Sequence, residues 1–299
     1  MIDVGDKALN VKLAVSASTV YHYTSMSVLP VFFKSNADLY CTNSKCLNDP
    51  TELYFGPLRF VDYLEVNHIF DKERARLLRG NIHETIQQDW FDAWVMSFSE
   101  AEDDLSQWRG YVSGRDGGYS IGFNRQKLVD ALSRLTILEV DKGEPANKIP
   151  IFTKCWYSVK DNADIKGLYE YMLRRYRDDF DRYQELKKVN DDIVRNVIAT
   201  IFSMSMHIKH DAFRGEREAR IIITVPGCNY SQMEVLGGKP RMPLGIPDIG
   251  VPLHSLIDKI YLSPHGNQDA LLAQATWLKK RTGANFEIVR SQIPYDPSR

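Results

Sequence analysis

The segment FRGEREARIIIT, residues 213–224, crowds glutamates and arginines against the start of an apolar run. Because residues i and i+2 of a strand share a face, Glu216, Glu218 and Arg220 are expected to project together. Two adjacent carboxylates repel each other, so in a cleft the pKa of at least one rises unless a cation such as Arg220 offsets the repulsion. Carboxylates with shifted pKa values are typical of catalytic sites, although structural ion pairs shift them too. The segment is therefore either part of a catalytic site or a solvated strand end with an ion pair.

Other polar residues interrupt apolar strand patterns elsewhere in the chain. His22 lies in VYHYT, and Tyr119 and Ser120 lie in GGYSIGF. The apolar neighbours of His22 make its burial costly unless the ring finds a hydrogen-bond partner. Each of these residues taken alone is more often a core residue than a catalyst, so only their combination points to a site.

Common nucleotide, hydrolase and metal motifs are absent from the sequence. It contains neither G-x-x-x-x-G-K-[ST] nor G-x-S-x-G, and GRDGGYSIG does not match G-x-G-x-x-G. His207 and His210 could share one helical turn, but no third ligand stands at a recognised metal spacing. We therefore expect neither a P-loop or Rossmann nucleotide site nor a bound metal.

Five separated motifs agree in order and spacing with a known family. They are VYHYTS, LNDPTE, VMSFSE, GGYSIGF and AFRGEREARIII. Over about residues 20–263 they resemble a large family of bacterial proteins formerly of unknown function. That family in turn is similar to the ADP-ribosyltransferase superfamily, whose His, Tyr and Glu lie on three successive core strands. The resemblance implies an ADP-ribosyltransferase-like fold and an enzyme that uses NAD as co-substrate without a metal.

The resemblance also implies roles for individual residues. His22 would hold a ribose hydroxyl of NAD, and HYT at 22–24 would replace His-Gly-Thr, so Tyr23 and Thr24 join the NAD-binding set. Tyr23 stands where that motif has a glycine whose bare backbone approaches the nicotinamide. Glu218, the second acid of E-x-E, would hydrogen-bond the nicotinamide ribose and support an oxocarbenium-like transition state.

The residue that meets the nicotinamide ring has several candidates. Tyr119, Ser120 and Tyr111 could each fill the middle position of the His-Tyr-Glu set. We prefer Tyr119 because it opens a strand, and we place Ser120 beside it in the cofactor-binding set. A flat aromatic ring suits stacking on nicotinamide.

The acceptor of the ADP-ribose would be recognised just before the glutamates. Glu216 would sit where related transferases place the acid that recognises the substrate, and Phe213, Arg214 and Arg217 would join it. With Lys209 and Arg220 these arginines form a basic cluster around one aromatic ring, a mixture that suits single-stranded nucleic acid. The same residues also suit an ordinary exposed loop. The resemblance to toxins and phage-defence transferases that modify nucleic acid implies a nucleic acid acceptor first and a protein acceptor second, in a toxin or phage-defence effector that an antitoxin or regulatory protein could restrain.

Two other functions are compatible with the sequence. The chain could be a catalytically idle NAD-binding or interaction module whose charged helix at 166–188 docks a protein partner. It could also be an NAD glycohydrolase that uses water as acceptor.

Composition limits the class of protein. The 299 residues are 43% hydrophobic with a formal charge of −1, which allows a sizeable core but gives no global field that attracts nucleic acid or lipid. No apolar run is long enough to span a bilayer, and the first 18 residues lack a secretory signal pattern. The four cysteines are too sparse for a disulfide framework. The sequence predicts a soluble cytoplasmic protein without a membrane partner.

Strand and helix patterns are interleaved without regular 30-residue units, which favours an α+β fold. We expect a single domain over 1–299 with a helical hairpin inserted at 160–209. LNDPTE predicts a capping box in which Asp49 caps a helix and Glu52 reaches back to it. We further expect helix over 57–90 broken near Gly80, a strand at 136–143 and a long surface loop at 227–252.

Overall fold

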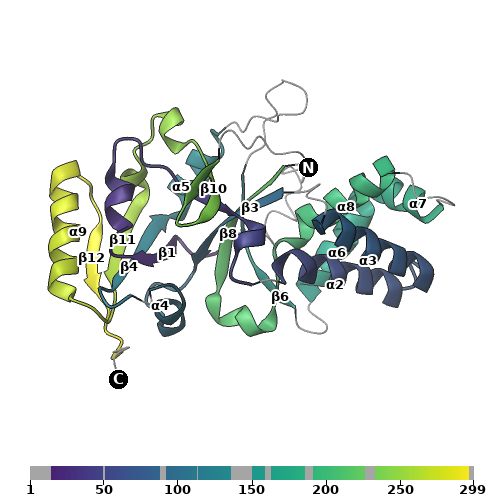
Figure 1. Ribbon diagram of the computed structural model, residues 1–299, viewed down its shortest axis with the longest axis horizontal. Coiled ribbons are helices and arrows are strands. Elements are labelled where there is room, and N and C mark those ends of the chain that lie inside the picture. The colour runs from purple at the N-terminus through teal and green to yellow at the C-terminus, as the bar shows by residue number, and fades with distance from the viewer. Residues whose placement is uncertain are drawn as a thin grey trace.

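The computed structural model describes residues 15–49, 51–87, 92–112, 114–135, 150–158, 163–185, 191–225 and 233–295. Within these ranges the protein is α+β, with a mixed sheet between helix α9 at one end and a helical cluster at the other (Figure 1). The α+β class predicted from the sequence is confirmed. The described helices include none with the length and apolar character that crossing a membrane requires.

In the described residues the main sheet has ten strands. Eight follow the order β12-β11-β4-β1-β3-β2-β10-β9, and β8 and β5 extend the sheet from the edge of β3 that faces away from β1 and β2. Its strands are β1 (Thr19–Ser25), β2 (Tyr40–Asn43), β3 (Asp92–Ser99), β4 (Gly118–Asn124), β5 (Ile151–Lys154), β8 (Glu218–Val225), β9 (Glu234–Leu236), β10 (Lys239–Pro243), β11 (Ile257–Leu262) and β12 (Glu287–Arg290). A second, parallel pair consists of β6 (Trp156–Ser158) and β7 (Ile208–His210).

The helices cover the ends and faces of this sheet. They are α2 (Glu52–Val66), α3 (Lys72–Gln87), α4 (Leu105–Tyr111), α5 (Arg125–Leu132), α6 (Ala163–Arg175), α7 (Arg177–Glu185), α8 (Asp191–Ser205) and α9 (Gln268–Thr282). Short 3-10 turns are η1 (Leu29–Phe33), η2 (Ser44–Cys46), η3 (Asp211–Glu216), η5 (Ile246–Ile249) and η6 (Leu253–Leu256).

Strand β3 is the point at which the sheet opens. One of its edges pairs with β8 along its whole length. The other edge is divided, because β2 pairs with Trp94 and Val95 whereas β1 meets β3 at Ser99. Within the described part of the chain, residues 96–98 have no ladder partner on that edge. Strands β1 and β2 therefore diverge along β3, and the backbone between them is available for other contacts.

The alternation of side chains along β3 separates two hydrophobic clusters. Trp94, Met96 and Phe98 belong to a cluster that α5, α9 and the turns η1 and η6 complete. Ala93 and Val95 belong to the opposite cluster, which α2, α3, α6, α7 and α8 complete. Strand β3 is thus fixed by packing on both faces.

The helical insertion differs in detail from the predicted hairpin. Its described part comprises three helices, α6, α7 and α8, because the first predicted helix is interrupted at Tyr176. Helix α8 buries Val197, Ile201 and Phe202, as its apolar sequence predicted. Strands β6 and β7, which flank the insertion, pair with each other, so the segment leaves and returns at neighbouring strands.

Other local predictions need correction. Helix α3 runs through Gly80, where an added Cβ would meet nothing within 4 Å, and the chain instead turns at Asn67 and His68, whose φ is 56°. The described part of the predicted loop, residues 233–252, contains the β9–β10 hairpin. The strand predicted at 136–143 lies outside the described residues.

Candidate functional site

A cavity of about 770 Å³ lies where β1 and β2 diverge from each other along β3. Its walls come from β1, β2, β3 and β10, together with the segment before β8. Pockets of roughly 300–1,000 Å³ are the usual size for small-molecule and cofactor sites. The opening of the sheet therefore produces a cavity large enough for a dinucleotide-sized ligand.

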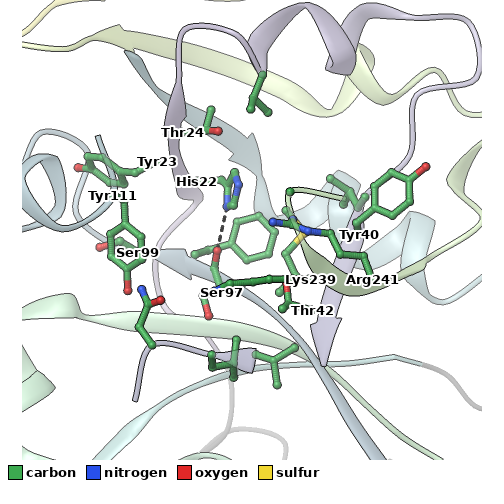
Figure 2. A pocket seen from close by; sticks show the side chains of 18 of the residues that line it. His22, Tyr23, Thr24, Tyr40, Thr42, Ser97, Ser99, Tyr111, Lys239 and Arg241 are labelled. Carbon is green, nitrogen blue, oxygen red and sulfur yellow. Dashed lines mark hydrogen bonds between the residues drawn. The ribbon is translucent and has the colours of Figure 1, made fainter. Parts of the chain in front are cut away.

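His22 stands on β1 at the edge of this cavity. Its Nδ1 lies 3.1 Å from the backbone carbonyl oxygen of Ser97, on the edge of β3 that lacks a ladder partner (Figure 2). Burial lowers the pKa of His22, so the ring is neutral near pH 7 and Nδ1 donates to this carbonyl. The tautomer so fixed leaves Nε2 as a hydrogen-bond acceptor. The unpaired edge of β3 between β1 and β2 thus fixes both the orientation of the His22 ring and its tautomer.

Glu218 is the first residue of β8 and is 4% exposed. Arg220 donates from Nε to its Oε1 at 2.6 Å and from Nη2 to its Oε2 at 3.0 Å. Lys209 donates from Nζ to Oε2 at 2.8 Å. Burial alone would raise the pKa of Glu218, but the charges of Arg220 and Lys209 outweigh burial and lower it to about 2. The cavity therefore contains a carboxylate that is ionised throughout the physiological pH range.

Lys209 also binds Glu216, the first acid of the E-x-E segment. Its Nζ lies 2.6 Å from Glu216 Oε2, and the Tyr111 hydroxyl donates to Glu216 Oε1 at 3.2 Å. Burial raises the pKa of Glu216, Lys209 opposes this rise and Glu218 adds to it. The repulsion between the two glutamates is thus offset by Lys209 as well as by Arg220. The sequence predicted the offsetting charge of Arg220 but not the contact of Lys209 with both glutamates.

The sequence predicted that the two glutamates project from one continuous strand, and the structure shows that they do not. Glu216 ends the 3-10 turn η3, and β8 begins only at Glu218. Between them Arg217 adopts a left-handed conformation with φ 46°. Their approach therefore depends on the turn and on Lys209 rather than on strand alternation.

Glu52 is a third acid of this cluster, and its predicted role as a capping-box residue is wrong. Its carboxylate is 5% exposed, accepts a hydrogen bond from Arg220 Nη2 and has Oε1 3.3 Å from Lys209 Nζ. Asp49 instead binds Thr51, whose backbone N–H lies 2.8 Å from Asp49 Oδ1. A glutamate at the start of an apolar helix was the only sign in the sequence that Glu52 could belong to the site. Its partners Lys209 and Arg220 are over 150 residues away along the chain, so sequence spacing did not connect them.

The ion cluster predicts how stability depends on pH. Glu218 has a folded pKa of about 2 against an ordinary value of 4.5, so its contribution is present above pH 4.5 and is lost as the pH falls toward 2. The contribution is about 3 kcal/mol at neutral pH. The difference in unfolding free energy between wild type and Glu218→Gln should be largest above pH 5 and shrink below it. Urea titrations at several pH values check this, and a constant difference would contradict it.

Tyr23 and Thr24 line the cavity beside His22, as their place on β1 requires. The Tyr23 ring turns to the opposite face, with its centroid 4.7 Å from that of Trp108 and its hydroxyl donating to the Ala101 carbonyl at 2.9 Å. The ring therefore packs on the side of β1 opposite His22. The contact between the Tyr23 backbone and nicotinamide stays a prediction.

Tyr119 and Ser120 do not reach the cavity, so the preference for them as cofactor contacts is corrected. Tyr119 is fully buried, and its hydroxyl lies 3.0 Å from Leu271 O and 2.8 Å from Gln274 Oε1 on α9, either of which accepts its proton. Ser120 donates to Glu102 O at 3.2 Å. Both side chains are buried around β4 and hydrogen-bonded to neighbouring segments of the chain.

Tyr111, the other candidate for the middle position, does line the cavity. It ends α4, is 40% exposed and contacts Glu216 through its hydroxyl. Its ring also borders a smaller hollow of about 280 Å³ that shares Gln107, Phe213 and Glu216 with the main cavity. Tyr111 and Glu216 thus stand between a larger and a smaller space.

The predicted acceptor-binding residues are dispersed rather than forming one basic patch. Phe213 lines both hollows and stacks under Lys209, whose Nζ lies 4.7 Å from the ring centroid. Arg214 pairs with Asp211 at 2.8 Å, and Arg217 is exposed. Lys209 and Arg220 are buried among carboxylates, so the cluster offers less surface charge than the sequence implied.

Two cations of the β9–β10 hairpin were missed in the sequence. Lys239 and Arg241 line the same cavity from β10, on the side of His22 away from Tyr111 (Figure 2). They fall in the stretch predicted to be a loop, where no strand alternation was recognised. Lys-Pro-Arg in that stretch was the only available signal.

Comparison with known proteins reaches only part of the chain. Residues 107–221 match a family described as a protein of unknown function (DUF2971). That segment runs from α4 to β8 and so includes Tyr111, Lys209, Glu216 and Glu218. Neither the curated proteins nor the solved structures contain a match.

Proposed function

We propose that the protein is an NAD-dependent ADP-ribosyltransferase that modifies a macromolecule. The observation that carries the proposal is the ionised carboxylate of Glu218, buried beside a ligand-sized cavity that His22 also lines. The order of motifs along the chain, with its resemblance to ADP-ribosyltransferases, supports the same function.

The proposed reaction breaks the bond between C1′ of a ribose and the nicotinamide nitrogen. The electron pair of that bond leaves with nicotinamide, while a nucleophile of the acceptor forms a new bond to C1′ and loses its proton. Positive charge develops on the ribose in between, as in glycoside hydrolysis. A preplaced carboxylate stabilises that charge more than it stabilises the ground state. Glu218 is held for this role by Arg220 and Lys209.

His22 and Glu216 would have separate roles on either side of the reacting bond. With Nδ1 committed to Ser97 O, the His22 Nε2 can accept a hydrogen bond from a ribose hydroxyl. Glu216 has the raised pKa of a group that can take a proton from the acceptor nucleophile. Because Glu216 also borders the smaller hollow, the acceptor is expected to enter from there.

Tyr111 would supply the aromatic surface for nicotinamide. We expect Tyr111→Ala to raise the KM for NAD roughly tenfold through loss of ring contact. Tyr111→Phe keeps the ring and should preserve KM while altering the pH profile, because Glu216 loses its hydroxyl donor. Initial rates of nicotinamide release at varied NAD concentration check both variants. Equal KM values for Tyr111→Ala and wild type would contradict the assignment.

Nucleic acid is the acceptor class that we propose first. Phe213 at the smaller hollow offers a ring for base stacking, and the exposed Arg217 lies nearby in sequence for a phosphate contact. Protein acceptors are the second class to be tested. A toxin or phage-defence role, with an antitoxin or regulatory protein as partner, belongs to the same proposal.

The test is to incubate the protein with NAD labelled on its adenylate and with separated RNA, DNA and protein fractions. Label in one macromolecular fraction with wild type and not with Glu218→Gln would support the transferase and identify the acceptor class. Free ADP-ribose formed at full rate without any macromolecule would instead make the protein an NAD glycohydrolase. NAD that stays intact with every fraction would contradict both enzymatic functions.

A further inference from the structure

The charged groups around the cavity are separated into an acidic side and a basic side. Glu216 and Glu218 lie with Tyr111 at one side of the cavity, as the hydrogen bond between Tyr111 and Glu216 requires. Lys239 and Arg241 lie beyond His22 on the other side (Figure 2). A ligand that fits both sides must carry an anionic group at a distance from the part that meets Glu218.

The basic side of the cavity carries two cations, Lys239 and Arg241. Within the part of the chain that the structure describes, neither Lys239 nor Arg241 makes an ion pair or a side-chain hydrogen bond, and Arg241 Nε is fully buried. A buried donor left unpaired is costly, so such groups normally have a partner. Arg241 is also close enough to His22 to lower the pKa of that ring further after burial has lowered it. Its charge is therefore directed into the cavity, where an anion would satisfy it.

The β9–β10 hairpin holds both cations in place. Lys239 and Arg241 are two residues apart on β10, so their side chains leave the same face. Arg241 is paired in register with Thr42 of β2 on one side and with Glu234 of β9 on the other. The hairpin turns through Gly237 and Gly238, whose φ values of 62° and 74° suit glycine. A cation on a strand with partners on both edges is a preorganised anion contact.

Two acidic residues, Asp38 and Glu234, line the same side of the cavity. Asp38 accepts hydrogen bonds from the backbone N–H groups of Leu39, Gly245 and Ile246, at 2.7–3.0 Å. Burial raises the pKa of the Tyr40 hydroxyl, and the adjacent carboxylate of Glu234 raises it further, so Glu234 is placed beside Tyr40. Asp38 and Glu234 thus each accept a hydrogen bond from another group, and among the described residues neither forms an ion pair with Lys239 or Arg241.

We propose that Lys239 and Arg241 form a subsite for the diphosphate of a dinucleotide whose ribose end reaches Glu218. A guanidinium binds two oxygens of one phosphate at once, and an ammonium adds a point charge to the next. The inference rests on the proposed function for the identity of the dinucleotide, which is NAD. It goes beyond that function in assigning the phosphate contacts to the β9–β10 hairpin.

The experiment compares equilibrium binding of ADP and adenosine by calorimetry, with wild type and the double variant Lys239→Gln, Arg241→Gln. ADP should bind wild type more tightly than adenosine, and the double variant should weaken ADP binding about 30-fold while changing adenosine binding less than about threefold. Lys72→Gln with Arg76→Gln, both exposed on α3, is the matched control and should leave ADP binding unchanged. Circular dichroism confirms folding, and the single variant Lys239→Gln serves if the double variant fails to fold.

The outcomes separate this subsite from the proposed function. Equal affinity for ADP and adenosine in wild type would overturn the subsite, whatever the enzyme does with NAD. Loss of binding to a short single-stranded oligonucleotide, with ADP binding intact, would assign the cations to an acceptor and also overturn it. Dependence of ADP binding on the pair in a protein that never releases nicotinamide would support the subsite and count against the transferase.

Discussion

Glu218→Gln is expected to lower the rate of nicotinamide release from NAD about a thousandfold or more. The amide keeps the shape of the side chain and an oxygen acceptor, but it removes the negative charge that would stabilise the ribose in the transition state. Because the charge acts mainly in the transition state, NAD affinity should change less than about threefold. Single-turnover rates and calorimetric binding of NAD, measured on the same preparation, check both parts.

Glu218→Gln also removes a charge that pairs with Arg220 and Lys209, so its main control must remove another acid from the same ion cluster. Glu52→Gln does so, since Glu52 binds the same Arg220 and Lys209 from α2. We expect its loss of activity to be at least tenfold smaller than that of Glu218→Gln, because Glu218 rather than Glu52 is assigned to the ribose. Equal losses in the two variants, with equal melting temperatures, would show that the cluster acts only structurally.

Lys209→Met is expected to show the second large effect. Lys209 contacts Glu52, Glu216 and Glu218 from a buried position, and its charge lowers the pKa values of Glu216 and Glu218. Without it both carboxyl groups protonate at higher pH, so the acid limb of the pH–rate profile should move up by about one unit or more. The maximal rate should fall about tenfold or more as the two glutamates separate.

The measurement is a pH–rate profile of nicotinamide release between pH 4 and 9, compared with wild type and with Lys72→Met at an exposed position of α3. Loss of buried packing would lower the rate equally at every pH, whereas the proposed electrostatic role moves the acid limb. An unchanged acid limb in a folded Lys209→Met variant would contradict the role given to Lys209. The control variant should match wild type throughout.

The sequence predicted the elements that local pattern determines. The alternation around His22 and the apolar run after Glu218 defined β1 and β8, and the apolar face of the last insertion helix predicted its burial. The helix break near Gly80 was wrong because an exposed glycine costs only about 1 kcal/mol in a helix that tertiary packing stabilises. The β9–β10 hairpin was missed because its short strands, one exposed and the other mostly half-buried, lack an apolar period.

The site was harder to predict because its contacts join distant segments. Sequence spacing brought Glu216 and Glu218 together but could not show that Glu52 joins the same cluster from α2. The choice of Tyr119 over Tyr111 failed for a related reason. The position of a tyrosine in a strand does not show which neighbour its ring contacts. Here Tyr119 packs against α9, whereas Tyr111 at the end of α4 lines the cavity.

The most direct test of the proposed transferase activity is nicotinamide release in a single turnover, with enzyme in excess over NAD labelled in its nicotinamide. The assay is run with each separated acceptor fraction and is preceded by calorimetry that establishes NAD binding. Wild type is expected to release the label as free nicotinamide, most rapidly with the fraction that becomes ADP-ribosylated. NAD that binds in the cavity and yet stays intact with RNA, DNA and protein fractions alike would contradict it.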